Sequence, residues 1–232
     1  MKTAIAIISY LLFTLSAYAL DLKTPAPVDM ISHSKPPSKD MYFASEIYPV
    51  GWSKDGHFAF VQKNEVAGRG GIKFSYFIID SVTDKVAWNY IDDWIDSNNT
   101  TIHQSIKKSK NRFKKQLEKY EIVQNRGIDL HAFPLNHGDQ KFFPEIEILK
   151  KKESHPFLGD IKSVSIFMNK NTKRKRIFLK KDPGAFSYWI TGYFASPFEK
   201  RILVGIGEEK WGHEGTEGHI IFSGCSLKSG YK

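Results

Sequence analysis

Two runs of basic side chains are the residues of this sequence best suited to binding a ligand. Residues 97–122 hold seven Lys or Arg against two Glu, and residues 170–181 hold seven Lys or Arg with no acid. Ammonium and guanidinium groups bind the phosphates of anionic lipids, lipopolysaccharide or nucleic acid. The candidate anion-binding residues are Lys107, Lys108, Arg112, Lys115, Lys173, Arg174 and Arg176.

The same runs have a structural interpretation, and the sequence leaves both open. A lysine-rich helix face is often only solvated, and a charged edge strand discourages one sheet from pairing with another. Nucleic acid is a disfavoured partner, because residues 170–176 contain no aromatic side chain that could stack on a base.

A glycine-rich loop near the end of the chain holds a second group of candidate residues. His213, Glu214 and His219, beside Trp211, could form the site of a hydrolase that acts on an anionic substrate. Their spacing matches no standard zinc site, and the chain has no Gly-x-Ser-x-Gly, Walker or His-Glu-x-x-His motif. We therefore expect no catalytic residue, no metal and no cofactor, and keep the hydrolase as an alternative.

The start of the chain has the features of a secretory leader. Lys2 gives a positive start, an apolar run follows, and Ala17-Tyr18-Ala19 is the small-x-small pattern that a signal peptidase cleaves. The run is too short for a membrane-spanning helix. We expect residues 1–19 to be a signal peptide and the protein to be exported, with the periplasm as its destination or secretion beyond it.

Composition limits what the rest of the chain can be. Prolines and polar residues make residues 20–44 a flexible tether, and residues 45–232 are expected to form one globular domain. Hydrophobic residues at 41% and aromatic residues at 14% are enough for a core and exclude wholesale disorder. Cys225 is the single cysteine, so an intramolecular disulfide is impossible, and burial is its expected state.

The spacing of apolar residues predicts a β-rich domain with one helix. Ile102, Ile106, Phe113, Leu117 and Tyr120 recur near a period of 3.6 and indicate an amphipathic helix over residues 99–120. Short apolar runs with turn residues between them indicate strands elsewhere. The candidate strands after the helix are residues 128–133, 143–149, 164–168, 176–179, 188–194, 202–205 and 219–225.

One segment resembles a blade of the WD40-like, TolB-type β-propellers, whose blades read hydrophobic-x-W-S-P-D-G-x-x-hydrophobic-A-hydrophobic. The matching residues are Val50-Gly51-Trp52-Ser53-Lys54-Asp55-Gly56-His57-Phe58-Ala59-Phe60, and an outer strand with a D-x-x-T-x-K turn follows at residues 77–85. The resemblance implies that Trp52 packs between sheets and that Asp55 and Gly56 close a hairpin. Lys54 stands where the family usually has proline.

A propeller needs about four or more blades to close, and this chain does not show four. A second, degraded unit is expected near the C-terminus, which would give two blade-like units at residues 46–96 and 186–228, joined by the helix and further strands. Residues 192–199 are also similar to a segment of exported bacterial proteins, a resemblance that brings no activity with it. The expected fold class is α+β, with antiparallel meander sheets and no complete propeller.

These observations favour an exported, non-enzymatic binding or envelope-associated protein. Its partner would be an envelope protein or an anionic surface component. Two alternatives remain: the hydrolase, and binding of a polyanion or anionic lipid through the basic runs.

Overall fold

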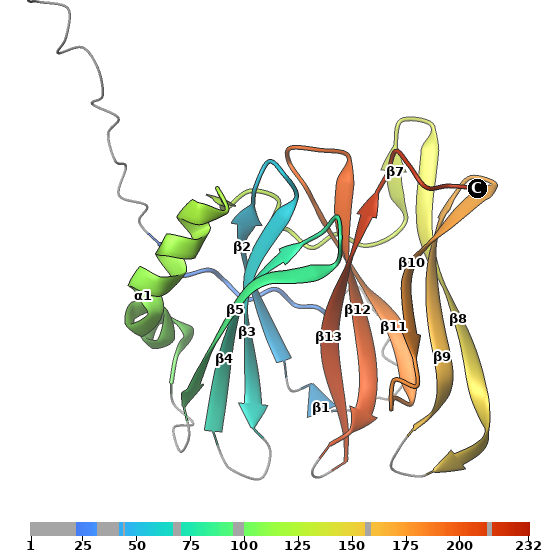
Figure 1. The fold of residues 1–232 in the computed structure, drawn as a ribbon, viewed down its shortest axis with the longest axis horizontal. Coiled ribbons are helices and arrows are strands. Elements are labelled where there is room, and N and C mark those ends of the chain that lie inside the picture. Colours follow the sequence, from blue (N-terminus) through green and yellow to red (C-terminus); the bar gives the residue numbers. More distant parts are fainter. Residues whose placement is uncertain are drawn as a thin grey trace, which may run out of the picture.

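The chain folds into four layers, one helix and three stacked β-sheets (Figure 1). The structure is a computed structural model that describes residues 22–31, 42–43, 45–66, 71–94, 100–155, 159–212 and 215–232. The three sheets are mostly antiparallel and open, and they do not close into a propeller. The predicted fold class, antiparallel β-sheets with one amphipathic helix, is confirmed.

The first sheet is the meander predicted around the Trp52 segment. Its strand order is β5-β4-β3-β2-β6. The strands are β2 (Ser45–Trp52), β3 (His57–Val66), β4 (Gly71–Asp80), β5 (Lys85–Trp94) and the short β6 (Val123–Gln124). Their alternating side chains point to two faces, so this sheet contributes to a core on each side.

The helix α1 (Ile102–Lys119) covers the outer face of the first sheet. It begins at a capping box, in which the Thr101 hydroxyl accepts a hydrogen bond from the Gln104 amide and the Gln104 side chain accepts one from the Thr101 amide. Ile106, Phe113 and Leu117 are buried against the sheet. The helix lies within the predicted range of residues 99–120.

The middle sheet has the strand order β1-β13-β12-β11. Its strands are β1 (Tyr42–Phe43), β11 (Ser187–Ala195), β12 (Arg201–Trp211) and β13 (Thr216–Ser226). One face packs Leu203 against Trp52 and Phe58 of the first sheet. The other face carries Val204 and Ile206 into a core shared with the third sheet.

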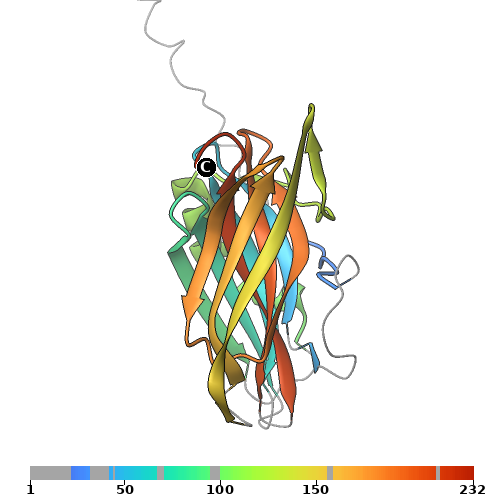
Figure 2. The same cartoon turned by 90° about the vertical axis from the view of Figure 1, so that its right-hand side faces the viewer.

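The third sheet has the strand order β10-β9-β8-β7 and forms the last layer, seen face-on in Figure 2. Its strands are β7 (Leu135–His137), β8 (Gln140–His155), β9 (Gly159–Lys170) and β10 (Lys173–Lys181). The inward residues Phe142, Val164 and Ile166 are fully buried against the middle sheet. Because β10 and β7 end the sheet, both are edge strands.

A change of register in β2 aims Trp52 at the middle sheet. Tyr48 and Val50 face the helix, and strict alternation would send Trp52 the same way. A β-bulge between Pro49 and Gly51 reverses the alternation. Trp52 is fully buried in the core between the first and middle sheets, where the blade resemblance predicts a tryptophan.

Two segments outside the strands pack on the sheets. Within the segment predicted as a tether, residues 22–31 lie against the domain: Leu22 and Met30 are buried, and the Val28 amide donates to the Ile47 carbonyl at 2.8 Å. The prediction of a strand at residues 128–133 is wrong. These residues cross β11 and pair with it at one point, where His131 bridges Tyr193.

The predicted signal peptide, residues 1–19, lies outside the described residues. Within the described part of the chain, no helix combines the length and the apolar character that crossing a bilayer requires.

Candidate anion-binding site

The two basic runs lie at opposite ends of the stack of layers. The helix α1 is the outermost layer on one side, and β10 belongs to the third sheet on the other side (Figure 1). The structure therefore does not join Lys107 and Lys115 with Arg174 and Arg176 in one site, and each run has to be judged separately.

The basic face of α1 is partly neutralised. Lys108 Nζ lies 2.5 Å from Asp92 Oδ1, and the Arg112 guanidinium stacks 4.2 Å from the centre of the Tyr90 ring. Lys107 and Lys115 are exposed. These contacts agree with the structural interpretation of this run, a solvated helix face that is tied to the sheet below it.

The basic run on β10 borders a hollow, which we call the cationic hollow. It has a volume of about 820 Å³ and lies at the edge of the stack where β10 faces β13. Five cationic side chains from three segments of the chain line it, together with one acidic residue, Asp84. The cations are Arg174, Lys175, Arg176, Arg201 and Lys232.

One wall of the cationic hollow comes from the turn between β4 and β5. This turn docks on β13, because the Asp84 carboxylate accepts hydrogen bonds from the Gly224 amide at 2.5 Å and from the Ser223 hydroxyl at 3.1 Å. A Cβ on Gly224 would lie 1.7 Å from the Ser81 carbonyl oxygen, so only glycine permits this approach. Burial raises the pKa of Asp84.

Arg201, the first residue of β12, is fixed beside that turn. Its Nε lies 2.8 Å from Glu199 Oε1, and its Nη1 donates to the Ser81 carbonyl at 3.1 Å. The side chain is therefore held in place before any ligand arrives. A pre-positioned guanidinium loses little conformational entropy when it binds an anion.

The C-terminal segment, residues 227–232, supplies a further part of the lining. Lys232 and Arg174 exchange two backbone hydrogen bonds, at 3.1 and 3.2 Å. Lys175 Nζ donates to the Ser229 carbonyl at 3.0 Å and also to the Ser226 carbonyl, and it lies 4.7 Å from the centre of the Tyr231 ring. Burial lowers the pKa of Lys175. Its role is therefore mainly to hold the segment against β10.

The cations of the hollow differ in how strongly they are already paired. Arg174 bonds Glu147 at 2.7 Å and stacks on Phe167 at 4.3 Å. Among the described residues, neither Arg176 nor Lys232 has an acidic partner. Their charges are the ones that a ligand could neutralise without breaking an existing ion pair.

A second hollow of about 370 Å³ extends the positive surface. It is lined by Lys170, Lys173 and Lys228, and it shares Gly230 with the cationic hollow. No acidic residue lines it. The two hollows together carry eight cations. Asp84 lies in their linings, and Glu147 and Glu199 pair with Arg174 and Arg201, so a positive surface remains that suits a ligand with several negative charges.

The side chains that line the cationic hollow are suited to binding an anion. The nearest thiol, Cys225, is 1% exposed, and burial raises its pKa, so it stays a neutral core residue as predicted. Among the described residues, no group of three or more His, Cys, Asp or Glu is arranged to hold a metal. Guanidinium and ammonium groups around a concave surface are suited to phosphate and carboxylate recognition.

Sequence reasoning found part of this site and missed the rest. Lys173, Arg174 and Arg176 were predicted, and they do lie on the rims of the two hollows. Arg201, Lys228 and Lys232 were missed, because each stands outside the basic runs. Only the strand order, which places β13 and the C-terminal segment beside β10, brings them in.

The other predicted pocket is not assembled by its described residues. His219 of β13 stands opposite Glu208 of β12, so the two side chains share one face of the middle sheet. Trp211 is three residues after Glu208 on β12, and an odd spacing along a strand places side chains on opposite faces. Trp211 and His219 therefore point to opposite faces of the sheet. His213 and Glu214 lie outside the described residues. The hydrolase therefore stays a prediction with no described site.

His219 instead borders a polar cluster that the sequence reasoning missed. Tyr188, Glu208 and His219 stand side by side on β11, β12 and β13, facing the third sheet. Glu208 is 3% exposed and bonds Lys180 of β10 at 2.9 Å and Lys210 at 2.5 Å. The sequence feature that could have revealed this cluster is Glu208 itself, an acidic residue two positions after Ile206 on the inward face of an otherwise apolar strand.

Comparisons of this chain with protein families, with curated proteins and with solved structures found no match. The resemblance of residues 50–85 to a propeller blade therefore stays a prediction.

Proposed function

We propose that this chain is an exported, non-enzymatic binding protein whose cationic hollow takes a multiply charged anionic component of the cell envelope. The observation that carries the proposal is the convergence of five cations from β10, β12 and the C-terminal segment on one concave surface. If the basic residues of β10 served only to keep an edge strand solvated, the cations would be confined to that strand. Arg201, held by Glu199 and Ser81 on another wall of the hollow, is not explained by that interpretation.

The charge balance supports a ligand with several anionic groups. Arg176 and Lys232 are unpaired among the described residues, and Lys173 and Lys228 extend the positive surface next to them. Binding that releases counterions from a polyanion weakens linearly on a logarithmic salt scale, with a slope set by the number of cations engaged. The proposal therefore predicts a salt dependence that specific residues control.

Retention on immobilised heparin, used as the polyanion probe, tests the proposal. The double variant Arg176→Glu, Lys232→Glu should elute at clearly lower salt than the unaltered protein, because it replaces both unpaired cations of the cationic hollow. The slope of log affinity against log salt should fall by about two, roughly one for each cation removed.

The helix offers a control with the same change in net charge. Lys107→Glu, Lys115→Glu replaces two exposed cations on α1, at the other end of the stack. This variant should elute close to the unaltered protein, with only the small shift that its lower net charge produces. If both variants lose the same amount of heparin retention, or if the helix variant loses more, the hollow is not the binding site.

A further inference from the structure

A third hollow, separate from the two on the basic surface, lies at the opposite edge of the middle and third sheets. The middle and third sheets stack so that β10 faces β13 at one edge and β8 faces β11 at the other. Between β8 and β11 is a slot of about 540 Å³, a volume typical of small-ligand sites. It is formed by different residues from the cationic hollow and so raises a separate question.

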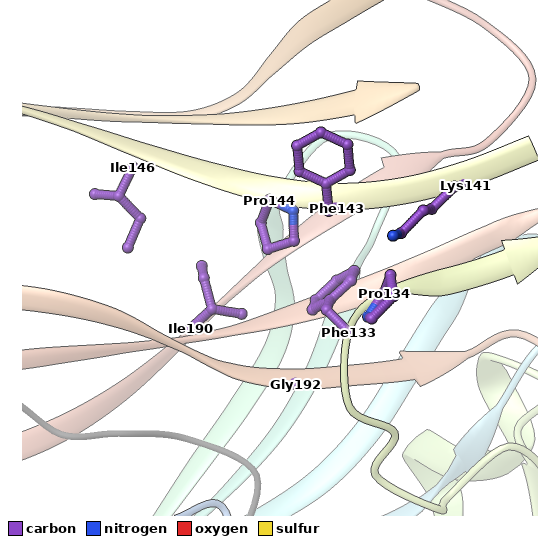
Figure 3. Close-up of a pocket in the computed structure, with 8 residues that line it drawn as sticks. All are labelled: Phe133, Pro134, Lys141, Phe143, Pro144, Ile146, Ile190 and Gly192. Carbon is purple, nitrogen blue, oxygen red and sulfur yellow. The ribbon is translucent and has the colours of Figure 1, made fainter. Parts of the chain in front are cut away.

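Most of the side chains that line the slot are apolar, although polar atoms also contribute to its surface. Ile146 and Pro144 of β8 point toward Ile190 of β11 across the gap, and Phe133 and Pro134 stand at one end (Figure 3). Ile190 and Ile146 are only half-buried. Apolar surface in a concave site is the usual feature of pockets that bind apolar ligands.

A close approach of the chain shapes that end of the slot. The segment with His131, Phe133 and Pro134 crosses β11 where Gly192 stands, and a Cβ on Gly192 would lie 2.6 Å from the His131 carbonyl oxygen. His131 and Tyr193 exchange two backbone hydrogen bonds of 2.9 Å beside it. The Phe133 end of the slot is therefore held in place by backbone contacts.

The lining contains one charged side chain, Lys141. It reaches toward Phe133 and Pro134 at the end of the slot (Figure 3). Among the described residues it has no acidic partner. One cation at the end of an apolar slot is complementary to a molecule with one anionic head and one apolar tail.

We propose that this slot binds a single-chain fatty acid, with the carboxylate paired to Lys141 and the alkyl chain lying between Ile146 and Ile190. A charge-assisted hydrogen bond from an ammonium to a carboxylate would fix the head. The tail would be removed from water between the two strands, and each additional buried methylene should tighten binding roughly threefold to fourfold.

Isothermal titration with defined amphiphiles, below their micelle concentrations, tests the proposal. Dodecanoate should bind, decanoate should bind about tenfold more weakly because it buries two fewer methylenes, and dodecyltrimethylammonium should not bind. Equal binding of the anionic and cationic chains would overturn the proposal, because the role of Lys141 would be lost.

Reversing the charge at the head gives the sharper test. Lys141→Glu should weaken dodecanoate at least tenfold and should create binding of dodecyltrimethylammonium. Lys152→Glu makes the same charge change on an exposed residue further along β8, and it should alter neither. Both lysines are on the surface, so both variants should fold. If Lys141→Glu and Lys152→Glu bind dodecanoate and dodecyltrimethylammonium with the same affinities as each other, the proposal is wrong.

Filling the slot tests the position of the tail. Ile190→Trp should abolish dodecanoate binding, whereas Leu149→Trp, at a residue 56% exposed on β8, should leave it unchanged. A folded Ile190→Trp variant that binds like the unaltered protein would contradict the proposal. If that variant fails to fold, the charge-reversal pair decides.

The same titration separates this site from the proposed function. Arg176→Glu, Lys232→Glu should leave dodecanoate affinity unchanged, because neither residue lines the slot. Loss of dodecanoate binding in this variant would place the fatty acid in the cationic hollow and would refute the slot.

Discussion

Glu208 is the residue that most clearly breaks the apolar pattern of this molecule. It is 3% exposed, and it follows Ile202, Val204 and Ile206 on the inward face of β12. Its carboxylate accepts hydrogen bonds from Tyr188 at 2.7 Å and from Lys180 at 2.9 Å, and it pairs with Lys210. A carboxylate is stable at this depth only because all three donors reach it.

The surroundings of Glu208 predict how stability changes with pH. Burial disfavours the charged form, but the hydrogen bonds from Lys210, Lys180 and Tyr188 outweigh it, so the pKa of Glu208 is lowered from its usual 4.5. A carboxyl group with a lowered folded pKa stabilises the protein above the unfolded pKa, and this contribution is lost as the pH falls through the folded value.

Glu208→Gln should therefore lower the unfolding free energy by about 1–3 kcal/mol at neutral pH, since charge-assisted hydrogen bonds are lost. The difference from the unaltered protein should shrink below the usual pKa of 4.5. Urea denaturation as a function of pH measures it. Glu153→Gln, an exposed glutamate on β8, is the control and should cost under about 0.5 kcal/mol. A cost for Glu208→Gln that does not vary with pH would contradict this account.

At the scale of elements, the attachment of α1 depends on a polar contact as well as an apolar stripe. Asp92 on β5 is 2% exposed and accepts hydrogen bonds from Ser105 at 2.9 Å and from Lys108 at 2.5 Å. Ser105 also contacts the Tyr76 hydroxyl at 2.6 Å. Asp92 therefore holds the helix from the strand beneath it.

Asp92→Ala should lower the unfolding free energy by about 2–3 kcal/mol, because it removes the buried carboxylate that accepts the Ser105 and Lys108 hydrogen bonds under the helix. Amide hydrogen exchange in residues 102–119 should accelerate more than exchange in the middle sheet. Asp93→Ala is the matched control, since Asp93 is exposed on the neighbouring position of β5. Equal exchange profiles in the two variants would rule out this attachment.

The elements themselves were predictable, and the site was only partly so. The stripe of Ile106, Phe113 and Leu117 has the helical period, and the turns at Asp55-Gly56 and Thr83 have local signatures, so sequence alone locates α1 and the first hairpins. The strand predicted at residues 128–133 failed because its apolar side chains pack on β11 without a continuous ladder.

The site depends on contacts between residues that are distant in the sequence. Arg201 stands beside Asp84 only because the β4–β5 turn docks on β13 at Gly224. Lys232 stands beside Arg174 only because the C-terminal segment pairs with the edge of β10. Neither contact leaves a periodic pattern, so charge counting could find one wall of the cationic hollow but not the other.

At the scale of the whole molecule, the middle sheet is what makes the layers one unit. Leu203 is fully buried against the first sheet, and Ile206, three residues later on β12, is fully buried against the third sheet. The two ligand sites proposed above lie at the two edges of the gap beside this sheet. Their geometry therefore depends on the middle sheet keeping its register with both neighbours.

Leu203→Ala and Ile206→Ala should each lower the stability of the whole molecule, although each creates a cavity in a different core: Leu203→Ala between the first and middle sheets, Ile206→Ala between the middle and third sheets. Large-to-small changes in a packed core cost about 2–5 kcal/mol, and a strand shared by two cores cannot lose one of them independently. Calorimetry should show a single transition, displaced to lower temperature in both variants, with calorimetric and van't Hoff enthalpies that agree. Leu149→Ala, at an exposed position of β8, should leave the transition nearly unchanged. The contrary result would be two separate transitions, of which each core variant displaces only one. The first sheet with its helix and the third sheet would then unfold independently, and the middle sheet would not couple them.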